Sequence, residues 1–499
     1  MRRYLLLGIV AIAAACAVAW QVRAAMERQR NTLVGQRDAQ WMAAYQQASQ
    51  AYASANYSEA VRILLTILPN AENWYSRDKR LPDALTLLGN SYSADHNIQQ
   101  AEPIFNRTLQ LYGSLLLGDS AEMGRVKLDL ANIYRDQGLY DKAEQSYSEA
   151  FAVLERNPPL TTGYDRGGAL LNLGYIRELQ GRYPEAEEFL KRSIATYGPY
   201  GAFAQHDLAS ALLHLADVYD FELHYSEAEA QYLKALAIQE KVSGPGSAEA
   251  GQTLTRLALV YTSLGQTSKA NELLNRAQEI AQHLSAPGGH PNGLLLDDLG
   301  AVAERRGKYA KAEAFYQKSI NAYESTDGSE ARDLAVPLAQ LGRLYRDEQQ
   351  FDIHEAEPLL LRALNIREKT LGKEHPETAS VLSDLSLLYF YEHRFKEAQQ
   401  FAERALPIEE KAYGPESLEV STTLNRLGIA ERDGHKVKQA ESSLKRALAI
   451  REKNLPANHT WIAISLENLA SVYLTQGKMD KARPLLVRAQ ASRAHSAGG

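Results

Sequence analysis

The stretch RVKLDLANIYRDQG, residues 125–138, has the apolar spacing of one face of an α-helix. Leu128, Ile133 and Tyr134 recur at helical intervals, with charged residues between them. The stretch ends on Gly138, a residue suited to the left-handed conformation that closes a helix. The sequence therefore predicts an amphipathic helix that ends at this glycine.

From about residue 38 onward, the chain repeats this pattern about every 42 residues. The clearest marker is an alanine that usually follows a charged or polar residue and precedes glutamate. Successive markers lie 41 to 44 residues apart, so the chain is one long repeat array and not several unrelated domains. The markers are Ala60, Ala101, Ala143, Ala186, Ala228, Ala270, Ala312, Ala356, Ala398, Ala440 and Ala482.

Two further small residues recur in most units, twelve residues before the marker and seven residues after it. Gly342 lies fourteen residues before Ala356, which indicates a two-residue insertion there. Small residues at fixed places let helix backbones approach closely, whereas larger side chains would push the crossings apart. Each unit is therefore predicted to be a pair of amphipathic helices that cross at the small sites.

The pattern of one unit resembles the tetratricopeptide repeat family: Leu-Gly or Leu-Ala, an aromatic residue three positions on, then Ala, Tyr and Ala in the second helix. The 42-residue period exceeds the 34 residues usual for that family and is similar to the subclass found in kinesin light chains. The stretch EAEPLLLRALNIREKTLGKEHPETA, residues 355–379, is similar to that subclass almost word for word. The pattern is weakest at Gln47-Ala48, and the packing tyrosine is missing at Arg177 and Glu431.

The resemblance implies an all-α fold, a right-handed superhelical α-solenoid of about eleven helix-turn-helix repeats. Its first helices would line a concave groove that binds a partner protein or peptide. The predicted organisation is a signal peptide or single-pass anchor at 1–25, a linker at 26–38, degenerate repeats at 39–122, the superhelix at 123–490 and a disordered tail at 491–499.

The N-terminus carries Arg2 and Arg3 before an uncharged run, YLLLGIVAIAAACAVAWQV, residues 4–22. Nineteen helical residues rise about 28 Å, close to the hydrocarbon thickness of a bilayer. Three fates remain open: an anchor, signal cleavage near Ala17 to Ala19, or lipidation at Cys16. For a bacterial source, the body would be anchored in the inner membrane facing the periplasm, or be periplasmic or secreted.

The composition argues against several function classes. A net charge of -6 without a basic stripe predicts no nucleic-acid partner. Cys16 is the only cysteine, so the body is predicted to have neither a disulfide nor a thiolate metal site. Searches for HExxH, GxSxG, a P-loop and a glycine-rich nucleotide turn find nothing. We therefore expect no enzyme activity, no cofactor and no small-molecule substrate.

Two features resemble chemical sites but have simpler explanations. Asp297 and Asp298 are consecutive, so on a helix they point about 100° apart and share a proton poorly. The stretch GKEHPETA, residues 372–379, sets His375 between two glutamates, but 42 residues later the same place reads GPESLEVS. It is predicted to be a loop between repeats, with no metal. Replacing His375 and His459 together by alanine is expected to leave stability unchanged.

The groove positions follow from the family's geometry: the residue just after the first-helix small site and the residue three positions further on. They vary between repeats, as a groove adapted to one partner would, although a solvated helix face is the alternative. Acidic, basic and apolar stretches would contact different segments of an extended partner. The predicted groove residues are Asn132, Arg135, Tyr175, Glu178, Asp217, Asp220, Arg343, Arg346, Leu387 and Phe390, with Tyr391 nearby.

The sequence thus predicts a non-enzymatic interaction scaffold of the cell envelope. Two alternatives are a structural or assembly component that acts through its convex face or self-association, and a regulatory subunit of an envelope enzyme. Tyrosines on the repeat's packing positions are predicted to be structural: Tyr92, Tyr134, Tyr219, Tyr261, Tyr345 and Tyr473.

Overall fold

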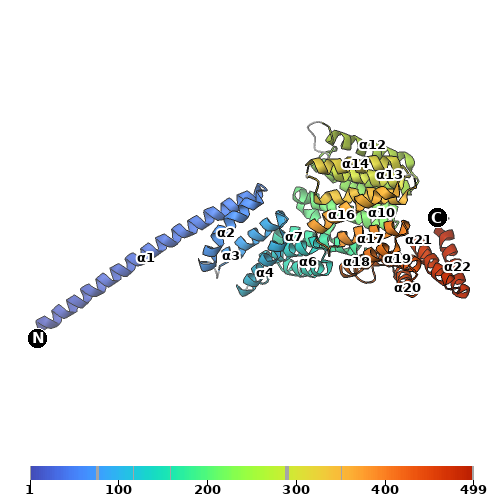
Figure 1. Ribbon diagram of the computed structural model, residues 1–499. Helices are drawn as coiled ribbons and strands as arrows, with labels where there is room; N and C mark the ends of the chain where they lie inside the picture. Colours follow the sequence, from blue (N-terminus) through green and yellow to red (C-terminus); the bar gives the residue numbers. More distant parts are fainter. Residues whose placement is uncertain are drawn as a thin grey trace. The chain divides into compact units, whose positions relative to one another are not determined.

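The computed structural model describes residues 2–74, 78–115, 117–157, 159–286, 292–326, 328–349 and 351–496. These residues form twenty-two α-helices and three short 3-10 helices, without a strand among them (Figure 1). The predicted all-α solenoid is confirmed. The chain divides into two compact units, Met1–Ile133 and Tyr134–Gly499.

The first unit begins with one long helix. Its core packs Trp41 and Ala48 of this helix against Leu64 and Leu85 of the helices that follow. The markers Ala60 and Ala101 are fully buried. The helices are α1 (Arg2–Ala53), α2 (Tyr57–Trp74), α3 (Arg80–Ala94), α4 (Ile98–Ser114) and α5 (Ala121–Asp136), whose last residues belong to the second unit.

Helix α1 runs through the predicted leader and linker. Residues 26–38, expected to be a linker, are helical and continuous with the first repeat. The side chains of residues 1–22 lie outside the described residues, so the predicted signal or anchor stays a prediction. In the part of the chain that the structure describes, no helix combines the length and the apolar character that a membrane crossing requires.

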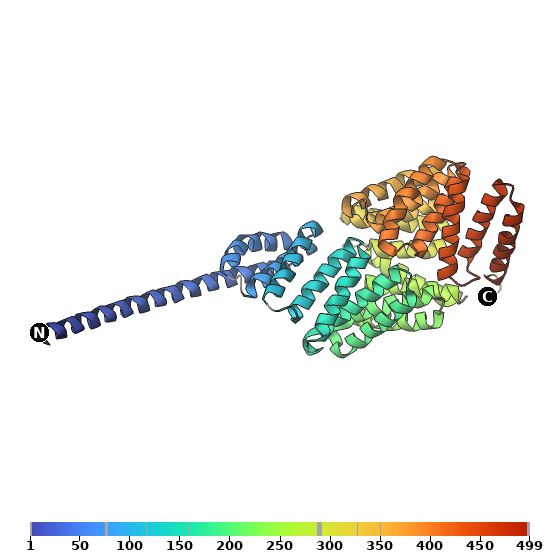
Figure 2. The same cartoon turned by 90° about the horizontal axis from the view of Figure 1, so that it is seen from below.

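The second unit consists of helix pairs that follow one another along a curved path (Figure 2). Its last helix extends to Ser496, whereas a disordered tail was expected from residue 491. Residues 497–499 lie outside the described residues. The helices are α6 (Tyr140–Glu155), α7 (Pro159–Leu179), α8 (Tyr183–Tyr197), α9 (Gln205–Phe221), α10 (Tyr225–Val242), α11 (Ala248–Ser263), α12 (Thr267–Leu284), α13 (Gly293–Arg305), α14 (Tyr309–Thr326), α15 (Ala335–Asp347), α16 (Ala356–Thr370), α17 (Pro376–Tyr391), α18 (Phe395–Tyr413), α19 (Leu418–Asp433), α20 (Val437–Asn454), α21 (Thr460–Thr475) and α22 (Met479–Ser496).

The first helices of the repeats lie on the inner side of this curve. Helix α13 contacts both α11 and α15, and α17 contacts both α15 and α19. Neighbouring second helices make no comparable contact within the described ranges. Because the inner side of a curved array is the shorter one, the odd-numbered helices from α7 to α21 form the inner face.

The small sites lie at helix crossings, as predicted. A Cβ added at Gly300 would lie 2.5 Å from the ring of Tyr316, and one added at Gly174 would lie 2.6 Å from Leu190. Each of the following markers is fully buried: Ala143, Ala186, Ala228, Ala270, Ala312, Ala356, Ala398, Ala440 and Ala482.

A hydrogen bond between repeats recurs along the array. The first-helix tyrosine donates to the glutamate that follows the marker of the preceding repeat. This confirms the structural role predicted for Tyr219, Tyr261, Tyr345 and Tyr473. The donor to acceptor distances are 2.9 Å for Tyr219–Glu187, 2.6 Å for Tyr261–Glu229, 2.8 Å for Tyr345–Glu313, 2.7 Å for Tyr389–Glu357 and 3.1 Å for Tyr473–Glu441.

Two of the repeats that lack this tyrosine compensate in different ways. Arg177 donates to Glu144, which replaces the tyrosine bond by a charged one. Where Glu431 replaces the tyrosine, the expected acceptor is Gln399, which accepts a hydrogen bond from Lys436 at 2.6 Å. A glutamate opposite Glu431 would repel it, so the change to glutamine removes an unfavourable pair.

The first helix of several repeats ends on a residue with positive φ, and glycine does not always occupy this position. Gly265 has φ 69°, whereas Leu223 adopts φ 65° at the same place in its repeat. We expect Leu223→Gly to raise the free energy of unfolding by about 0.5 to 1 kcal/mol, because only a side chain that is 64% exposed is lost and backbone strain is relieved. Urea unfolding measures the effect. The control Leu264→Gly, at φ -77°, should be destabilising, and stabilisation by both variants would contradict this explanation.

Successive turns of the second unit touch each other. His375 Nε2 lies 3.2 Å from the carbonyl oxygen of Asp136, although 239 residues separate them. The rings of Tyr140 and Tyr413 lie 5.7 Å apart, and α6 runs beside α18 (Figure 1). We call this set of residues, with Gly138 and Pro376, the turn contact. The repeats therefore complete one superhelical turn within this span.

His375 caps helix α17 as well as joining the turns. Its Nδ1 accepts a hydrogen bond from the backbone N–H of Glu377 at 3.1 Å, so Nε2 carries the hydrogen that is donated to Asp136. Burial lowers the pKa of His375. The loop interpretation of GKEHPETA is confirmed for residues 372–375, whereas residues 376–379 form the first turn of α17. The structure argues against the expectation that His375 and His459 can be replaced together without a change in stability, because the His375 ring is buried and bonded on both sides.

Gly138 allows the turns to approach. A Cβ at this position would lie 2.2 Å from Cδ of Pro376, whereas a Cβ at Gly265 would meet nothing within 4 Å. Both glycines have nearly the same φ, 70° and 69°. We expect Gly138→Ala to lower the free energy of unfolding by about 1 to 3 kcal/mol more than Gly265→Ala, because only the first clashes. Equal urea midpoints for the two variants would show that the turns do not touch in solution.

Candidate functional site

Polar side chains on the inner face bond from one repeat to the next. Each bond joins a predicted groove residue to a residue two positions before the small site of the following first helix. The pairs are Arg135 Nη1 to Asn172 Oδ1 at 2.6 Å, His214 Nδ1 to Glu178 Oε2 at 2.9 Å, Arg256 Nη1 to Asp217 Oδ2 at 2.5 Å and Arg343 Nη1 to Asp384 Oδ2 at 3.2 Å. The inner face is therefore held together by its own ladder of polar contacts.

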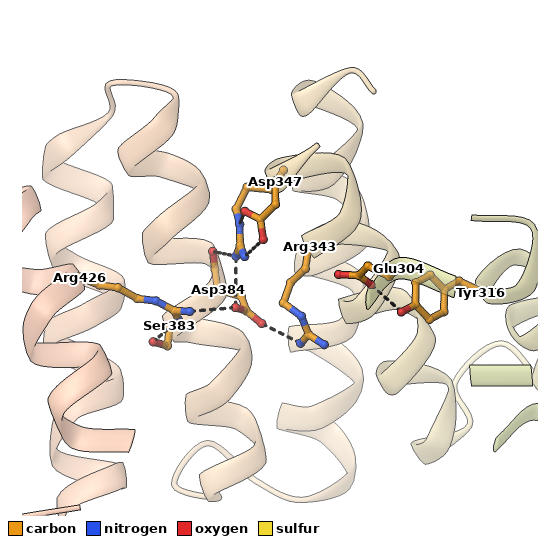
Figure 3. Close-up of polar contacts among 8 residues, drawn as sticks. Glu304, Tyr316, Arg343, Asp347, Ser383, Asp384 and Arg426 are labelled. Carbon is orange, nitrogen blue, oxygen red and sulfur yellow. Dashed lines mark hydrogen bonds and ion pairs between the residues drawn. The ribbon is translucent and has the colours of Figure 1, made fainter. Parts of the chain in front are cut away.

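Asp384 is the centre of the densest polar cluster (Figure 3). Its side chain is 5% exposed and accepts from Arg346 Nη1 at 3.2 Å in addition to Arg343. Arg426 Nη2 lies 3.6 Å from Asp384 Oδ1, and its Nη1 donates to Ser383 Oγ at 2.6 Å. Burial alone would raise the pKa of Asp384, but the three guanidinium groups outweigh it and hold this pKa below its usual value.

The structure corrects one predicted groove residue. Arg346 was expected to face a partner, but its side chain is 3% exposed and bonds to Asp384 and to Asp347. It is buried because Asp384 of the next first helix lies within its reach. Arg343 remains partly exposed, although it is paired with the same carboxylate.

The other predicted groove residues have mixed surroundings. Tyr175 lies against His214, with ring centres 4.9 Å apart. Asp220 is half-buried, and burial raises its pKa while Arg305 opposes the shift. Asn132 and Leu387 are half-buried. The rings of Phe390 and Tyr391 lie 5.8 Å apart, and Tyr391 is 48% exposed. Neither cavity described below brings all of these residues together.

Sequence reasoning missed the acceptor and donor series on the facing helix. These residues lie two positions before each first-helix small site, where polar side chains interrupt an apolar stretch. Their 42-residue recurrence was present in the sequence and could have shown the ladder. The series is Asp129, Asn172, His214, Arg256, Asp298, Gln340, Asp384, Arg426 and Asn468.

Among the described residues, one group offers ligands for a metal ion. Glu178, His214 and Asp217 each present a ligand atom, and these atoms lie within 4.8 Å of one another. In the structure Asp217 is bonded to Arg256 and Tyr232, and His214 is bonded to Glu178. A metal ion would have to displace these contacts, so the arrangement fits an ion-pair network better.

Two cavities lie on opposite sides of the second unit. The inner pocket, about 360 Å³, is lined by α15, α17, α18, α19 and α21, including Asp384, Glu409 and Trp461. The outer groove, about 560 Å³, is lined by α12, α13 and α14, including Leu296, Phe315 and Lys318.

Comparison with known proteins identifies the repeats. Overlapping segments match the tetratricopeptide repeat model: residues 80–156, 122–198, 165–241, 207–283, 293–352, 347–411, 392–453 and 419–494. The search of curated proteins gave no match.

Two solved structures show similar helical repeats. BtubC (BKLC) from P. vanneervenii is 23% identical over 45% of this chain and 89% of its own, with a TM-score of 0.38. Putative kinesin light chain TPR-like repeats from Podosopora anserina are 24% identical over 41% of this chain and 96% of their own, with a TM-score of 0.35. Because the family model matches most of the length, the chain belongs to the tetratricopeptide repeat family.

Proposed function

We propose that the chain is a non-catalytic scaffold that binds a partner protein or peptide on its inner face. The observation that carries this proposal is the contrast along the first helices. Packing positions repeat the same residue types, whereas inner-face positions change from the acidic Asp217 to the basic Arg343 and the apolar Leu387. Repeats of this family present extended surfaces to partners, and uniform packing with variable faces suits that role.

The inner pocket supports the proposal. It lies where Arg343, Asp384 and Arg426 meet, and its volume is about 360 Å³. Its walls come from several consecutive repeats, so a bound segment would contact more than one of them. The repeats of this family generally act as non-catalytic scaffolds, which agrees with the absence of enzyme motifs in the sequence.

A second candidate function rests on the outer groove. Its lining includes Ala281, Leu296, Phe315 and Ala322, which would suit an apolar segment or a second copy of the chain. In that case the chain would act as a structural or assembly component through its outer face.

Affinity capture of the full chain, solubilised in mild detergent, separates these functions. A scaffold brings down a distinct partner protein in a defined ratio, and a self-assembling component brings down only copies of itself. Recovery of an active enzyme would favour a regulatory subunit. Capture of the chain alone, in its own oligomers, would contradict the scaffold proposal.

The proposal includes a location in the cell envelope. It rests on the charged start and the uncharged run of residues 4–22. We expect the repeats to be digested by protease added outside the cytoplasmic membrane, and protection from protease in cells with a permeabilised outer layer would contradict this location.

A further inference from the structure

The inner pocket contains acceptors that nothing in the described chain satisfies. Glu409 is 4% exposed, lines the pocket, and its Oε2 has no hydrogen-bond partner among the described residues. Glu419 lines the same pocket, and its Oε2 is likewise buried without a partner there. A buried acceptor without a donor costs about 1 to 3 kcal/mol, so these two oxygens are suited to a donor from outside the chain.

The cations in the pocket are already paired. Arg343 Nη1 donates to Asp384 Oδ2 at 3.2 Å, and Arg426 Nη1 donates to Ser383 Oγ at 2.6 Å while its Nη2 lies 3.6 Å from Asp384. These groups therefore do not call for an anionic ligand. The two oxygens that lack a donor, Glu409 Oε2 and Glu419 Oε2, both belong to carboxyl groups, so the ligand group that would suit them is a donor with positive charge.

Burial adds to this preference. Burial raises the pKa of Glu409 to about 8 although a hydrogen bond with Thr423 and the charge of Arg426 oppose the shift, and the nearby charge of Glu419 adds to it. Burial also raises the pKa of Glu419. Two neighbouring carboxylates that resist ionisation would be stabilised by one cation between them.

The remaining walls suit the stem of a long side chain. Trp461 and Tyr413 line the pocket, and aromatic rings attract cations and pack against methylene groups. A metal ion would leave most of the 360 Å³ unfilled. A guanidinium group, unlike an ammonium group, presents donors in a planar fork that can reach two carboxylates at once.

We propose that the inner pocket binds an arginine side chain of the partner polypeptide, with its guanidinium group between Glu409 and Glu419 and its stem against Trp461 and Tyr413. This inference rests on the proposed scaffold function, since it names the chemistry by which that partner is recognised.

The test uses acetyl-arginine methylamide as the probe and acetyl-citrulline methylamide as its neutral isostere. Ligand-observed NMR measures the binding of each compound to the full chain. We expect the arginine probe to bind about tenfold more tightly than the citrulline probe, because hydrogen bonds to charged groups are stronger. The double variant Glu409→Gln, Glu419→Gln should lose about tenfold in affinity for the arginine probe. It should fold, because it removes two buried carboxylates without changing their shape.

Glu416→Gln is the matched control, because Glu416 is an exposed glutamate paired with Lys453 and lies outside the pocket. It should bind the arginine probe as the parent does. Equal binding of the two probes, no binding of either, or an unchanged affinity in the double variant would overturn the assignment. So would saturation of the pocket by Ca²⁺ alone that excludes the arginine probe. If the full chain still captures a partner protein in any of these cases, the scaffold function stands and only the arginine assignment falls.

Discussion

Replacing Asp384 by asparagine lowers the local free energy of unfolding of the repeats around α17 by about 3 to 5 kcal/mol. The reason is the charge that remains. The Asp384 carboxylate is the shared acceptor for Arg343, Arg346 and Arg426, and the side chain of Arg346 is 3% exposed. Removing one partner of a buried ion pair leaves the other charge without compensation, which is more costly than the loss of the pair itself.

Hydrogen exchange of the α17 amides and the urea midpoint measure this effect. Asp347→Asn is the matched control, because Asp347 binds the same arginine at 2.6 Å but is 42% exposed. That exposed pair should contribute about 1 kcal/mol or less. Similar protection losses in the two variants would mean that the cluster is solvated in solution, contrary to the structure.

The replacement of Asp297 by threonine acts in the opposite direction and stabilises the chain at neutral pH. Asp297 is 2% exposed, and neither of its carboxylate oxygens has a hydrogen-bond partner among the described residues. The nearby Ser319 hydroxyl carries one hydrogen, which it donates to the carbonyl of Gly293 at 2.9 Å. Burial therefore raises the pKa of Asp297 to about 8, with smaller contributions from Asp298 and Asp333.

Threonine is the replacement that the repeat itself suggests. Thr255 occupies the same place one repeat earlier, where it is buried and donates to the carbonyl of Gly251 at 2.8 Å. At pH 7 the solution lies about three pH units above the pKa of the unfolded aspartate, which is near 4, so the unfolded carboxyl group is ionised. The folded carboxyl group is mostly protonated at the same pH. We expect Asp297→Thr to raise the free energy of unfolding by about 3 to 4 kcal/mol at this pH.

The pH dependence is the sharper test of the same explanation. The folded state binds a proton at Asp297 between about pH 4 and pH 8, and the unfolded state does not. The parent therefore loses stability as the pH rises through this window, while the variant lacks this contribution. The difference between them should shrink toward pH 4 and reach its maximum above pH 8. A difference that does not vary with pH would show that Asp297 is solvated or paired.

The repeat pattern made the fold predictable from the sequence. The markers and small sites recur because helix crossings tolerate only small residues, and Gly300 shows this directly through its contact with Tyr316. The turn contact could not be predicted, because it depends on the sum of small rotations between repeats. No single unit of the sequence encodes that sum, although His375 and Gly138 are the residues that meet.

The candidate site was predictable only in part. The groove positions were chosen on one helix at a time, so the partner of Arg346 on the next helix was missed. Whether a polar side chain on the inner face is free or bonded depends on the facing residue one repeat on. Glu409 was missed for another reason: it lies on a second helix, and only the packing of α18 against α19 places it in the inner pocket.

Partner binding by the inner face is tested most directly by photo-crosslinking in living cells. A photoreactive amino acid placed at Thr422 samples the inner pocket, and one placed at Lys318 samples the outer groove. Both are single sites on helices of the same unit, so they control for each other. We predict a covalent adduct with a distinct partner protein from position 422 and none from position 318. An adduct from position 318 alone would contradict binding at the inner face.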